Sequence, residues 1–536
     1  MTRQIARTKG KPGPIFAATA SLVVGVVLAV GCSSAPSTPS GDVTAGGGNE
    51  AAGLAAEPRE IWQAIYFGDT KVGHAVTRIR PHFADGRRLV AFTHDESITI
   101  ARDGQKSTQF HSASTTETDS GQLLRFTSVL STGESPLLVS GQCSDGSLDL
   151  VTQSQGKMQV TRLAWDADWG GFFAVERSLF ERPMKPGELR KVTCLLPVFY
   201  VAGETDLQAF DFEETKLLEG SRSLLHIRAK QKLGERTLKF EYWTTADGEV
   251  LKMRSPTFDQ VTYVTTREQA LDAADAGTFD VLQASLVPVE APFESAHRQR
   301  RVRYEVRVTG SPAQGLFRAS SQQNVKVIDE HTVELDVRAQ AGGSSTSEAG
   351  SAELDGSSRA LSGADDRPTK GDEAPGSLIQ SDDARIVAMA AEAAAEMLDT
   401  VELARRLEAY VHDKIENKSF ALGFASAAEV AENLEGDCTE HAVLLVALCR
   451  ARAIPARVAI GLVHLPTASG FAFHMWTEVW TGDRWLSLDA TAGRGGTGAG
   501  YLKMSHTNLS GSDGFSAMAP VVEVMGRLQI KVLDFE

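Results

Sequence analysis

Three side chains near the C-terminal end of this 536-residue chain could together perform thiol chemistry: Cys438, His474 and Asp489. A cysteine attacks as its thiolate, which is favoured at the N-terminus of a helix, where the helix dipole is positive. Asp437 is a favourable N-cap and Glu440 follows three residues later, so Cys438 is predicted at the first helical position. A cysteine in apolar surroundings is more often a core residue, so a nucleophile also requires a base.

A predicted hairpin supplies the base and a residue that orients it. Residues 473–480 and 484–489 alternate apolar and polar side chains, as strands do, and a short turn with glycine joins them. His474 lies near the start of the first strand and Asp489 at the end of the second, so the hairpin brings them together. In this arrangement His474 takes the thiol proton and Asp489 fixes the tautomer of the imidazole.

The sequence around these residues resembles the bacterial branch of the transglutaminase-like superfamily. Four segments match in order: residues 436–442 (GDCTEHA), 453–458 (AIPARV), 474–479 (HMWTEV) and 485–491 (WLSLDAT). The resemblance covers about residues 378–536 and implies a papain-like core, in which a buried helix presents the cysteine against an antiparallel sheet. It also implies that Cys438 is the nucleophile, His474 the base and Asp489 the orienting residue. The backbone N–H of Cys438 would then help to bind the oxyanion.

Other pocket residues are predicted only by their positions. His441 lies one turn after the cysteine and either lines the pocket or packs against the helix. Trp476 shares the strand of the histidine and is a candidate for the pocket wall, although aromatic residues on strands usually pack in cores. Animal transglutaminases have a tryptophan upstream of the cysteine; none occurs between residues 378 and 438 here, and Phe424 is a loose substitute.

A zinc site is an alternative use of the cysteines and histidines in this region. Cys438 and Cys449 are eleven positions apart on one predicted helix, which is about 16 Å at 1.5 Å per residue. They are therefore too far apart for one ion or one disulfide, and Cys449 is expected in the core. No acidic loop suits calcium either, so the prediction is an enzyme without a metal or another cofactor.

The rest of the chain alternates between strand patterns and linkers. Residues 58–270 and 271–338 contain short alternating segments, and are predicted as a β-rich domain followed by a small β-rich domain. Residues 339–377 are rich in Gly, Ser, Pro and acidic residues and are predicted as a disordered linker. Residues 378–536 begin with helical periods and form the predicted catalytic domain. The predicted fold class is α+β, with the papain-like core preceded by antiparallel β-rich regions.

The N-terminus has the features of an export signal. Basic residues precede an uncharged apolar run at 15–31, and Cys32 follows directly. Residues 28–32 resemble a bacterial lipoprotein processing site, which implies cleavage and lipidation at Cys32. A simple signal peptide and an uncleaved membrane helix are the alternatives. Residues 1–32 are predicted as the signal and 33–57 as a flexible tether, so the protein is expected in the cell envelope or periplasm, attached to a membrane.

The net charge and the number of cysteines argue against nucleic-acid binding and against a disulfide scaffold. The formal net charge is −15, and nucleic acid is not an expected partner because its binding normally requires a basic face. Five cysteines are too few for a disulfide scaffold in an exported chain. Cys143 and Cys194 lie in the same β-rich region and could pair, but the sequence leaves their separation open.

Two functions remain possible. The first is an exported cysteine enzyme that acts on peptide or isopeptide bonds through a thiol acyl-enzyme, with a protein or peptide as its substrate. Hydrolysis is favoured over cross-linking because the periplasm is rich in water and nothing suggests a second site for an amine. The second is a non-catalytic binding module that uses a papain-like scaffold. The presence of all three reactive residues favours the enzyme.

Overall fold

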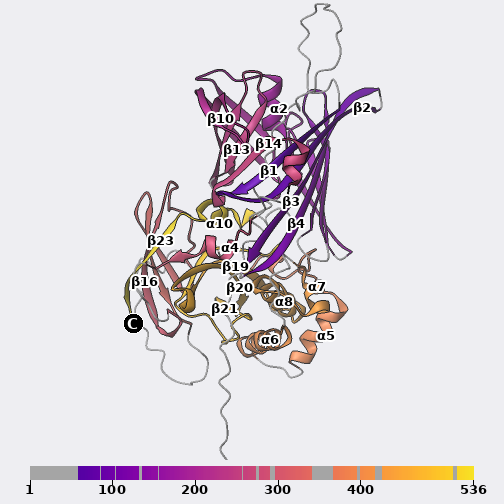
Figure 1. Ribbon diagram of the computed structural model, residues 1–536. Helices are drawn as coiled ribbons and strands as arrows, with labels where there is room; N and C mark the ends of the chain where they lie inside the picture. Colours follow the sequence, from indigo (N-terminus) through magenta and orange to yellow (C-terminus); the bar gives the residue numbers. More distant parts are fainter. Residues whose placement is uncertain are drawn as a thin grey trace, which may run out of the picture.

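The computed structural model describes residues 58–84, 86–102, 104–131, 136–154, 156–255, 257–272, 277–289, 296–340, 366–394, 399–416, 425–510 and 516–536. The predicted signal and tether, with Cys32, lie outside these residues, and so does Phe424. In Figure 1 the N-terminal strands form the upper part of the molecule, and the C-terminal helices lie below them. No helix among the described residues combines the length and the apolar character needed to cross a membrane.

One antiparallel sheet of fourteen strands accounts for most of the N-terminal half. Its order is β8-β7-β6-β5-β4-β3-β2-β1-β14-β13-β12-β11-β10-β9, so nearly every strand pairs with its neighbour in the chain. The strands are β1 (Arg59–Phe67), β2 (Thr70–Ala84), β3 (Arg87–Arg102), β4 (Gln105–Thr118), β5 (Leu123–Ser131), β6 (Leu137–Ser144), β7 (Ser147–Ser154), β8 (Lys157–Ala164), β9 (Leu189–Leu195), β10 (Ala202–Lys216), β11 (Ser221–Leu233), β12 (Arg236–Thr244), β13 (Val250–Ser255) and β14 (Gln260–Thr265).

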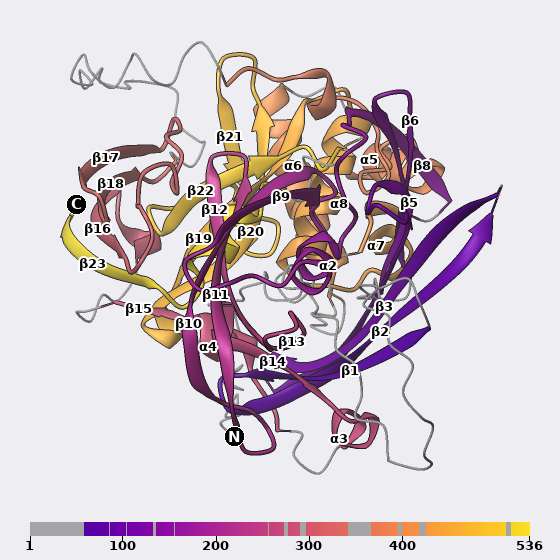
Figure 2. The same cartoon turned by 90° about the horizontal axis from the view of Figure 1, so that it is seen from above.

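This sheet is strongly curved. Figure 2 shows that it bends around helix α2 (Ala174–Glu181). Alternate side chains on β3 and β7 point inward and are buried, whereas the residues between them are partly exposed. Phe173, just before α2, stacks on Phe92 of β3 with ring centroids 5.4 Å apart. The inward rows of these strands therefore supply the core, as the alternating sequence pattern predicts. Cys143 and Cys194 are on β6 and β9, which are not neighbours, and both thiols are free.

A second, small sheet has the order β17-β18-β16-β23. Its strands are β16 (Arg301–Val308), β17 (Gln323–Asp329), β18 (Thr332–Arg338) and β23 (Leu528–Phe535). The last strand of the chain thus belongs to the small middle sheet, although the sequence places residues 378–536 in one catalytic unit. Buried Val302, Tyr304 and Val306 form one face of β16, and β23 supplies the hydrogen bonds that its edge needs.

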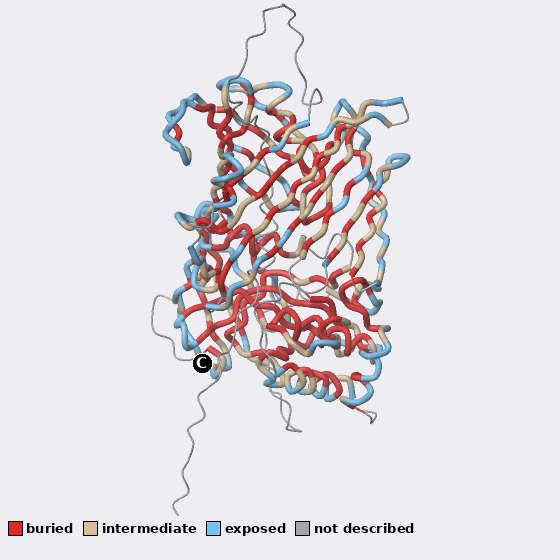
Figure 3. Tube along the Cα trace, turned by 45° about the vertical axis from the view of Figure 1, so that its right-hand side comes forward, coloured by how far each residue is buried: buried red, intermediate tan, exposed pale blue. Residues whose placement is uncertain are grey.

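The C-terminal sheet has the order β15-β20-β19-β22, and β21 pairs with β20. Its strands are β15 (Val287–Pro288), β19 (Ala456–Leu465), β20 (Gly470–Trp480), β21 (Trp485–Leu488) and β22 (Tyr501–Thr507). Helices α5 (Ala384–Ala393), α6 (Thr400–Lys414) and α7 (Ala427–Asn433) surround α8 (Cys438–Ala451), which packs against β20. All residues of α8 up to Arg450 are buried, which confirms the predicted central helix. Figure 3 shows a nearly continuous buried stretch in the lower part of the molecule, and the helices at the bottom of the view alternate between buried and exposed residues.

Short helices cover the remaining surfaces. They are α3 (Arg267–Leu271), α4 (Val281–Ser285), α10 (Ala519–Val524) and the 3-10 turns η2 (Thr257–Asp259), η3 (Ala296–Arg298), η4 (Lys370–Asp372) and η5 (Pro466–Ala468). Leu282 of α4 and the following Leu286 pack against Trp476 on the face of β20 opposite to α8. Helices α5 to α8 gather around the C-terminal sheet, while the other two sheets are antiparallel and have only short helices beside them, which is consistent with the predicted α+β class.

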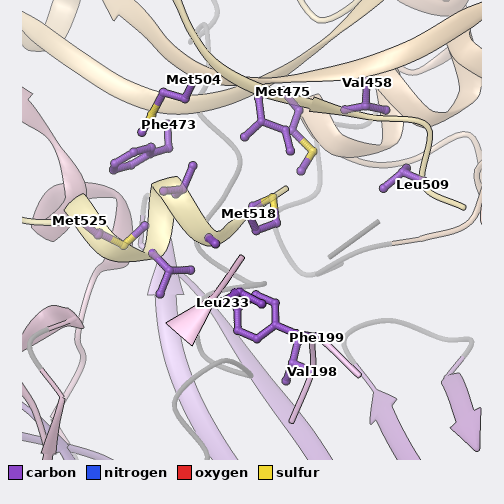
Figure 4. Close-up of a cluster of buried hydrophobic side chains, with 14 of the residues drawn as sticks. Val198, Phe199, Leu233, Val458, Phe473, Met475, Met504, Leu509, Met518 and Met525 are labelled. Carbon is purple, nitrogen blue, oxygen red and sulfur yellow. The ribbon is translucent and has the colours of Figure 1, made fainter. Parts of the chain in front are cut away.

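The large sheet is joined to the C-terminal part through α10. In Figure 4, Phe199 and Leu233 of the N-terminal part lie below Met518, and Phe473 and Met475 of β20 lie above it. Arg236 of β12 forms an ion pair with Glu523 of α10 at 2.6 Å, and both side chains are largely buried. Through these apolar and charged contacts the large sheet supports the C-terminal sheet, which carries the candidate active site.

Part of the predicted linker lies against the C-terminal sheet. Both carboxylate oxygens of Asp366 accept hydrogen bonds from Arg457, at 2.6 and 2.9 Å. Arg450 of α8 donates to the carbonyl of Ala374 at 3.0 Å. Residues 341–365 lie outside the described part of the chain. The C-terminal unit therefore includes residues upstream of the predicted boundary at 378.

Candidate active site

The start of α8 places Cys438 against the edge of β20. Asp437 is the N-cap, because its Oδ1 accepts the backbone N–H of Thr439 at 3.0 Å. Glu440 returns the contact by accepting the N–H of Asp437 at 3.0 Å, which completes the predicted capping box. β15 pairs with β20 up to Phe471 and β21 from residue 477 onward, so neither strand covers the stretch between. In this gap the N–H of Met475 donates to Cys438 Sγ at 3.4 Å.

His474 and Asp489 meet as the hairpin predicts. His474 Nε2 lies 2.8 Å from Asp489 Oδ2. Burial by itself would raise the pKa of Asp489, but attraction to His474 and hydrogen bonds from His474 and Tyr501 lower it below its usual value. An ionised carboxylate can only accept, so His474 carries its proton on Nε2. Its Nδ1 is buried and has no hydrogen-bond partner among the described residues.

Tyr501 is a partner of Asp489 that sequence reasoning missed. Its hydroxyl donates to Asp489 Oδ2 at 2.6 Å, beside the bond from His474. The other oxygen, Oδ1, accepts the backbone N–H of Thr491 at 2.9 Å. The Tyr501 ring meets Trp476 edge to face with centroids 5.5 Å apart. Tyr501 is on β22, two strands away from β20, and no local sequence pattern connects it with the carboxylate.

Glu408 of α6 is a second missed neighbour. Its Oε1 accepts the backbone N–H of Asp489 at 3.1 Å. The residue is buried, and burial together with the charge of Asp489 raises the pKa of Glu408 to about 7. The helical pattern of residues 400–414 marks Glu408 as one polar residue within a helix, and nothing in that pattern distinguishes it from solvent-exposed glutamates.

We expect Glu408→Gln to flatten the pH dependence of stability between pH 5 and pH 8. Because the folded pKa of about 7 exceeds the ordinary value of 4.5, the folded state binds this proton more tightly than the unfolded state. Stability therefore falls as pH rises from 4.5 to 7, by about 3 kcal/mol at most. The amide keeps an acceptor for the N–H of Asp489 but does not titrate.

Urea unfolding at pH 5, 6, 7 and 8 measures this slope. The matched control is Glu402→Gln, which changes an exposed glutamate of the same helix and should leave the slope unchanged. An unaltered slope in the Glu408→Gln protein would contradict the assignment of this titration to Glu408.

Two of the three predicted pocket residues lie within the described part of the chain, and their surroundings differ. His441 Nδ1 lies 2.6 Å from the carbonyl of Asp437, so its ring is held against the start of its own helix. Trp476 is buried, and its ring stacks near His474 with centroids 6.4 Å apart. Trp476 therefore packs beside the imidazole, on the face covered by α4. Phe424 cannot be placed, because it lies outside the described residues.

The alternative of a zinc site has no support among the described residues. No three of their His, Cys, Asp or Glu side chains are arranged to hold a metal ion. Cys449 is in the core, as expected, and burial raises the pKa of its thiol far above the usual range. Cys438, His474 and Asp489 are themselves 0%, 1% and 3% exposed. A substrate would reach the thiol only after local opening of this conformation.

Comparisons with known proteins agree with the position of the site. A family model described as the transglutaminase-like superfamily matches residues 387–490, which include Cys438, His474 and Asp489. No curated protein matches the chain. Among solved structures, a protein of Cytophaga hutchinsonii provisionally named a cysteine protease is similar, with 16% identity and a TM-score of 0.28, over 44% of this chain and 91% of the other.

A second similar structure is a protein of Bacteroides fragilis, provisionally named an exported protein with a YmcC-like fold. It has 11% identity and a TM-score of 0.16, over 38% of this chain and 92% of the other. The family match lies in the region where the four sequence segments predicted it. Residues 387–490 are therefore a transglutaminase-like domain in the C-terminal part of the chain.

Proposed function

We propose that this protein is a cysteine-dependent enzyme that cleaves peptide or isopeptide bonds through a thiol acyl-enzyme. Cys438 is the nucleophile, His474 the base and Asp489 the residue that orients the base. The observation that carries the proposal is the position of His474. Its Nε2 lies 2.8 Å from Asp489 Oδ2, and the next residue, Met475, donates its backbone N–H to Cys438 Sγ at 3.4 Å. A nucleophile, a base and an orienting carboxylate are the parts that activated thiols require.

The first half of the reaction acylates the enzyme. His474 Nδ1 takes the proton of Cys438, and the resulting thiolate attacks the carbonyl carbon of the substrate. The oxyanion forms near the N-terminus of α8, where the helix dipole and the backbone N–H of Cys438 stabilise negative charge. The imidazolium then protonates the leaving amine, the C–N bond breaks, and a thioester remains on Cys438.

The second half releases the acyl group. Water gives a proton to His474 Nδ1 and attacks the thioester, and the thiol of Cys438 leaves with the proton that His474 returns. An amine in place of water would give cross-linking instead. We favour hydrolysis because water is abundant in the periplasm, the location proposed below for this protein.

Product analysis after incubation with a peptide library tests this proposal. The reduced full chain should produce fragments with a new carboxylate, and Cys438→Ala should produce none. Cys449→Ala is the matched control, because it removes a buried thiol from the same helix and should retain activity. Addition of a primary amine separates the two reactions, since transfer gives an amide product and hydrolysis gives the acid. Equal products from the wild type and Cys438→Ala would overturn the proposal.

A non-catalytic binding module is the second candidate, favoured by the complete burial of Cys438. A thiol that never becomes accessible would act only as a packing residue at the start of α8. In that case Cys438→Ala would retain any ligand binding, and alkylation of the folded protein at Cys438 would not depend on His474.

We further propose that the protein is exported and lipid-anchored through Cys32. The basic and apolar N-terminal segment, with small residues directly before Cys32, supports this location. Incorporation of a radiolabelled fatty acid in bacterial cells tests it, with Cys32→Ala as the control. Lipid on Cys32→Ala, or none on the wild type, would contradict the anchor.

Tyr501→Phe is expected to slow the reaction about tenfold with little change in KM. The substitution removes one hydrogen bond to an ionised carboxylate, and 1.4 kcal/mol of lost support corresponds to about tenfold in rate. Tyr501 contacts Asp489 rather than the substrate, so kcat should change. Steady-state kinetics on a cleaved peptide provide the measurement. Tyr410→Phe, which removes an exposed hydroxyl bound to Glu392, is the control. An unchanged kcat would show that Tyr501 does not support Asp489.

A further inference from the structure

A cavity of about 870 Å³ lies at the junction of the small sheet, the segment at Asp366 and the β20–β21 hairpin. Arg318, Arg367, Arg484, Trp480 and Trp485 are among its lining residues. Figure 2 shows β17 and β18 beside the C-terminal sheet near β21 and β22. Trp480 is six residues beyond His474 on β20, about 20 Å along a strand, so this cavity is separate from the thiol site.

The floor of the cavity is held by a buried network. The guanidinium carbon of Arg457 lies 3.8 Å from the ring centroid of Trp485, behind the cavity wall. Trp485 Nε1 donates to the carbonyl of Asp366 at 2.6 Å, and the Asp366 carboxylate is bound by Arg457. Trp480 meets Trp485 edge to face with centroids 5.4 Å apart. A ligand would therefore meet an aromatic surface that is already in place, which lowers the cost of binding.

The rim of the cavity carries unneutralised positive charge. Arg318, Arg367 and Arg484 are exposed, and within the described part of the chain none of their guanidinium groups takes part in a recorded ion pair or hydrogen bond. Of the two lining carboxylates, Asp366 is paired with Arg457, whereas Asp483 accepts from the neutral Thr481 hydroxyl at 2.9 Å and keeps its charge. The three arginines still leave the lining with a net positive charge.

The chemistry of the lining defines the ligand. A guanidinium group binds a carboxylate through two parallel hydrogen bonds, and tryptophan faces bind flat apolar groups. Cavities of 300–1,000 Å³ hold small molecules, roughly from a single amino acid derivative to a disaccharide. We propose that this cavity binds a small organic anion in which a carboxylate lies next to a flat apolar group. This inference does not depend on the proposed activity at Cys438.

Isothermal titration calorimetry of the full chain at low ionic strength tests the proposal. The probes are two pairs, each of an anion and a neutral compound. N-acetylphenylalanine and its neutral amide differ only in the carboxylate. Glucuronate and glucose test whether a sugar acid, which has a carboxylate but no flat apolar group, also binds. The charged member of a pair is expected to bind at least about tenfold more tightly than the neutral one. Binding of glucuronate but not of N-acetylphenylalanine would overturn the proposal, because glucuronate has a carboxylate but no flat apolar group.

Matched arginine variants assign the binding to this cavity. Arg318→Gln and Arg484→Gln should each weaken the charged probe by about tenfold. Arg222→Gln changes an exposed arginine of β11 in the large sheet and should leave binding unchanged. All three substituted side chains are exposed, so the variants should fold, which circular dichroism can verify. Absence of binding by all probes, equal binding of charged and neutral probes, or equal binding by wild type and both cavity variants would each overturn the proposal.

Discussion

His474→Ala is expected to slow the alkylation of Cys438 by iodoacetamide at pH 7 by about tenfold or more. In the proposed mechanism His474 Nδ1 takes the thiol proton, while Nε2 is bound to Asp489. Without the imidazole only the helix dipole favours the thiolate, so the apparent pKa should move toward the value of about 8.5 of a free cysteine. At pH 9.5 the wild type and the variant should react at similar rates.

Mass spectrometry of the intact, reduced protein after timed alkylation gives the rate for each pH. Because Cys438 is fully buried, reaction requires local opening, and this step slows the wild type and the variants alike. The shape of the pH profile therefore reports the thiol, while its absolute height reports the opening. Asp489→Asn should give an intermediate profile, because the amide retains an acceptor but lacks the charge.

The control for this experiment is a protein in which Cys449 is replaced by alanine, so that the second thiol of the same helix cannot be modified. Identical pH profiles for the wild type and His474→Ala would contradict an activated thiol. That result would favour the binding-module function, in which Cys438 only fills the start of α8.

Glu478→Leu is expected to lower the free energy of unfolding of the C-terminal domain by about 3–5 kcal/mol. Glu478 is 1% exposed, and its carboxylate binds Lys503 Nζ at 2.5 and 2.7 Å and Arg457 Nε at 2.7 Å. Arg457 retains Asp366 as a partner after the substitution, but Lys503 loses the carboxylate that neutralises it in the interior. An uncompensated buried charge is costly, whereas the intact pair contributes much less than its loss would suggest.

Urea unfolding followed by a signal from the C-terminal domain measures this loss. Asp149→Asn removes an exposed ion pair with Arg162 and should have a much smaller effect. A double variant, Glu478→Leu with Lys503→Met, removes both charges and should recover part of the lost stability. An effect of Glu478→Leu no larger than that of Asp149→Asn would show that the network contributes little.

The same network predicts a dependence on acid. Burial alone would raise the pKa of Glu478, but attraction to Lys503 and Arg457 lowers it below 4.5. A carboxyl with a lowered folded pKa contributes its stabilisation above the unfolded value, and this contribution is lost as pH falls through the folded pKa. The wild type should therefore lose stability below about pH 4.5, and Glu478→Leu should lose less over that range.

The large sheet takes part in the architecture of the C-terminal domain. Arg236 and Leu233 of the large sheet reach α10, and the last strand β23 leaves the catalytic unit to pair with β16. The sequence predicted strands in residues 58–338 but none at β23, and it placed the domain boundaries by composition and by the change from strand to helical periodicity. Composition does not predict that two segments more than 200 residues apart will pair as strands, because either edge of a sheet accepts a strand of similar pattern.

The sequence by itself determined the parts of the site that depend on neighbours in the chain. The capping box of Asp437 and Glu440 starts α8 at Cys438, because these groups satisfy each other's backbone N–H within one turn. The hairpin brings Asp489 to His474, because a short turn sets the register of two adjacent strands. Local hydrogen bonds and turns of this kind depend on residues close together in the chain, so the sequence predicts them.

Only the tertiary structure decided which distant groups surround these residues. Tyr501 and Glu408 reach Asp489 from β22 and α6, and the register that places them results from packing of the whole domain. The same holds for the cavity beside Trp485, whose walls come from four segments that are far apart in the sequence. Packing is non-directional and involves many residues at once, so side-chain partners across long separations depend on the folded core rather than on any short pattern.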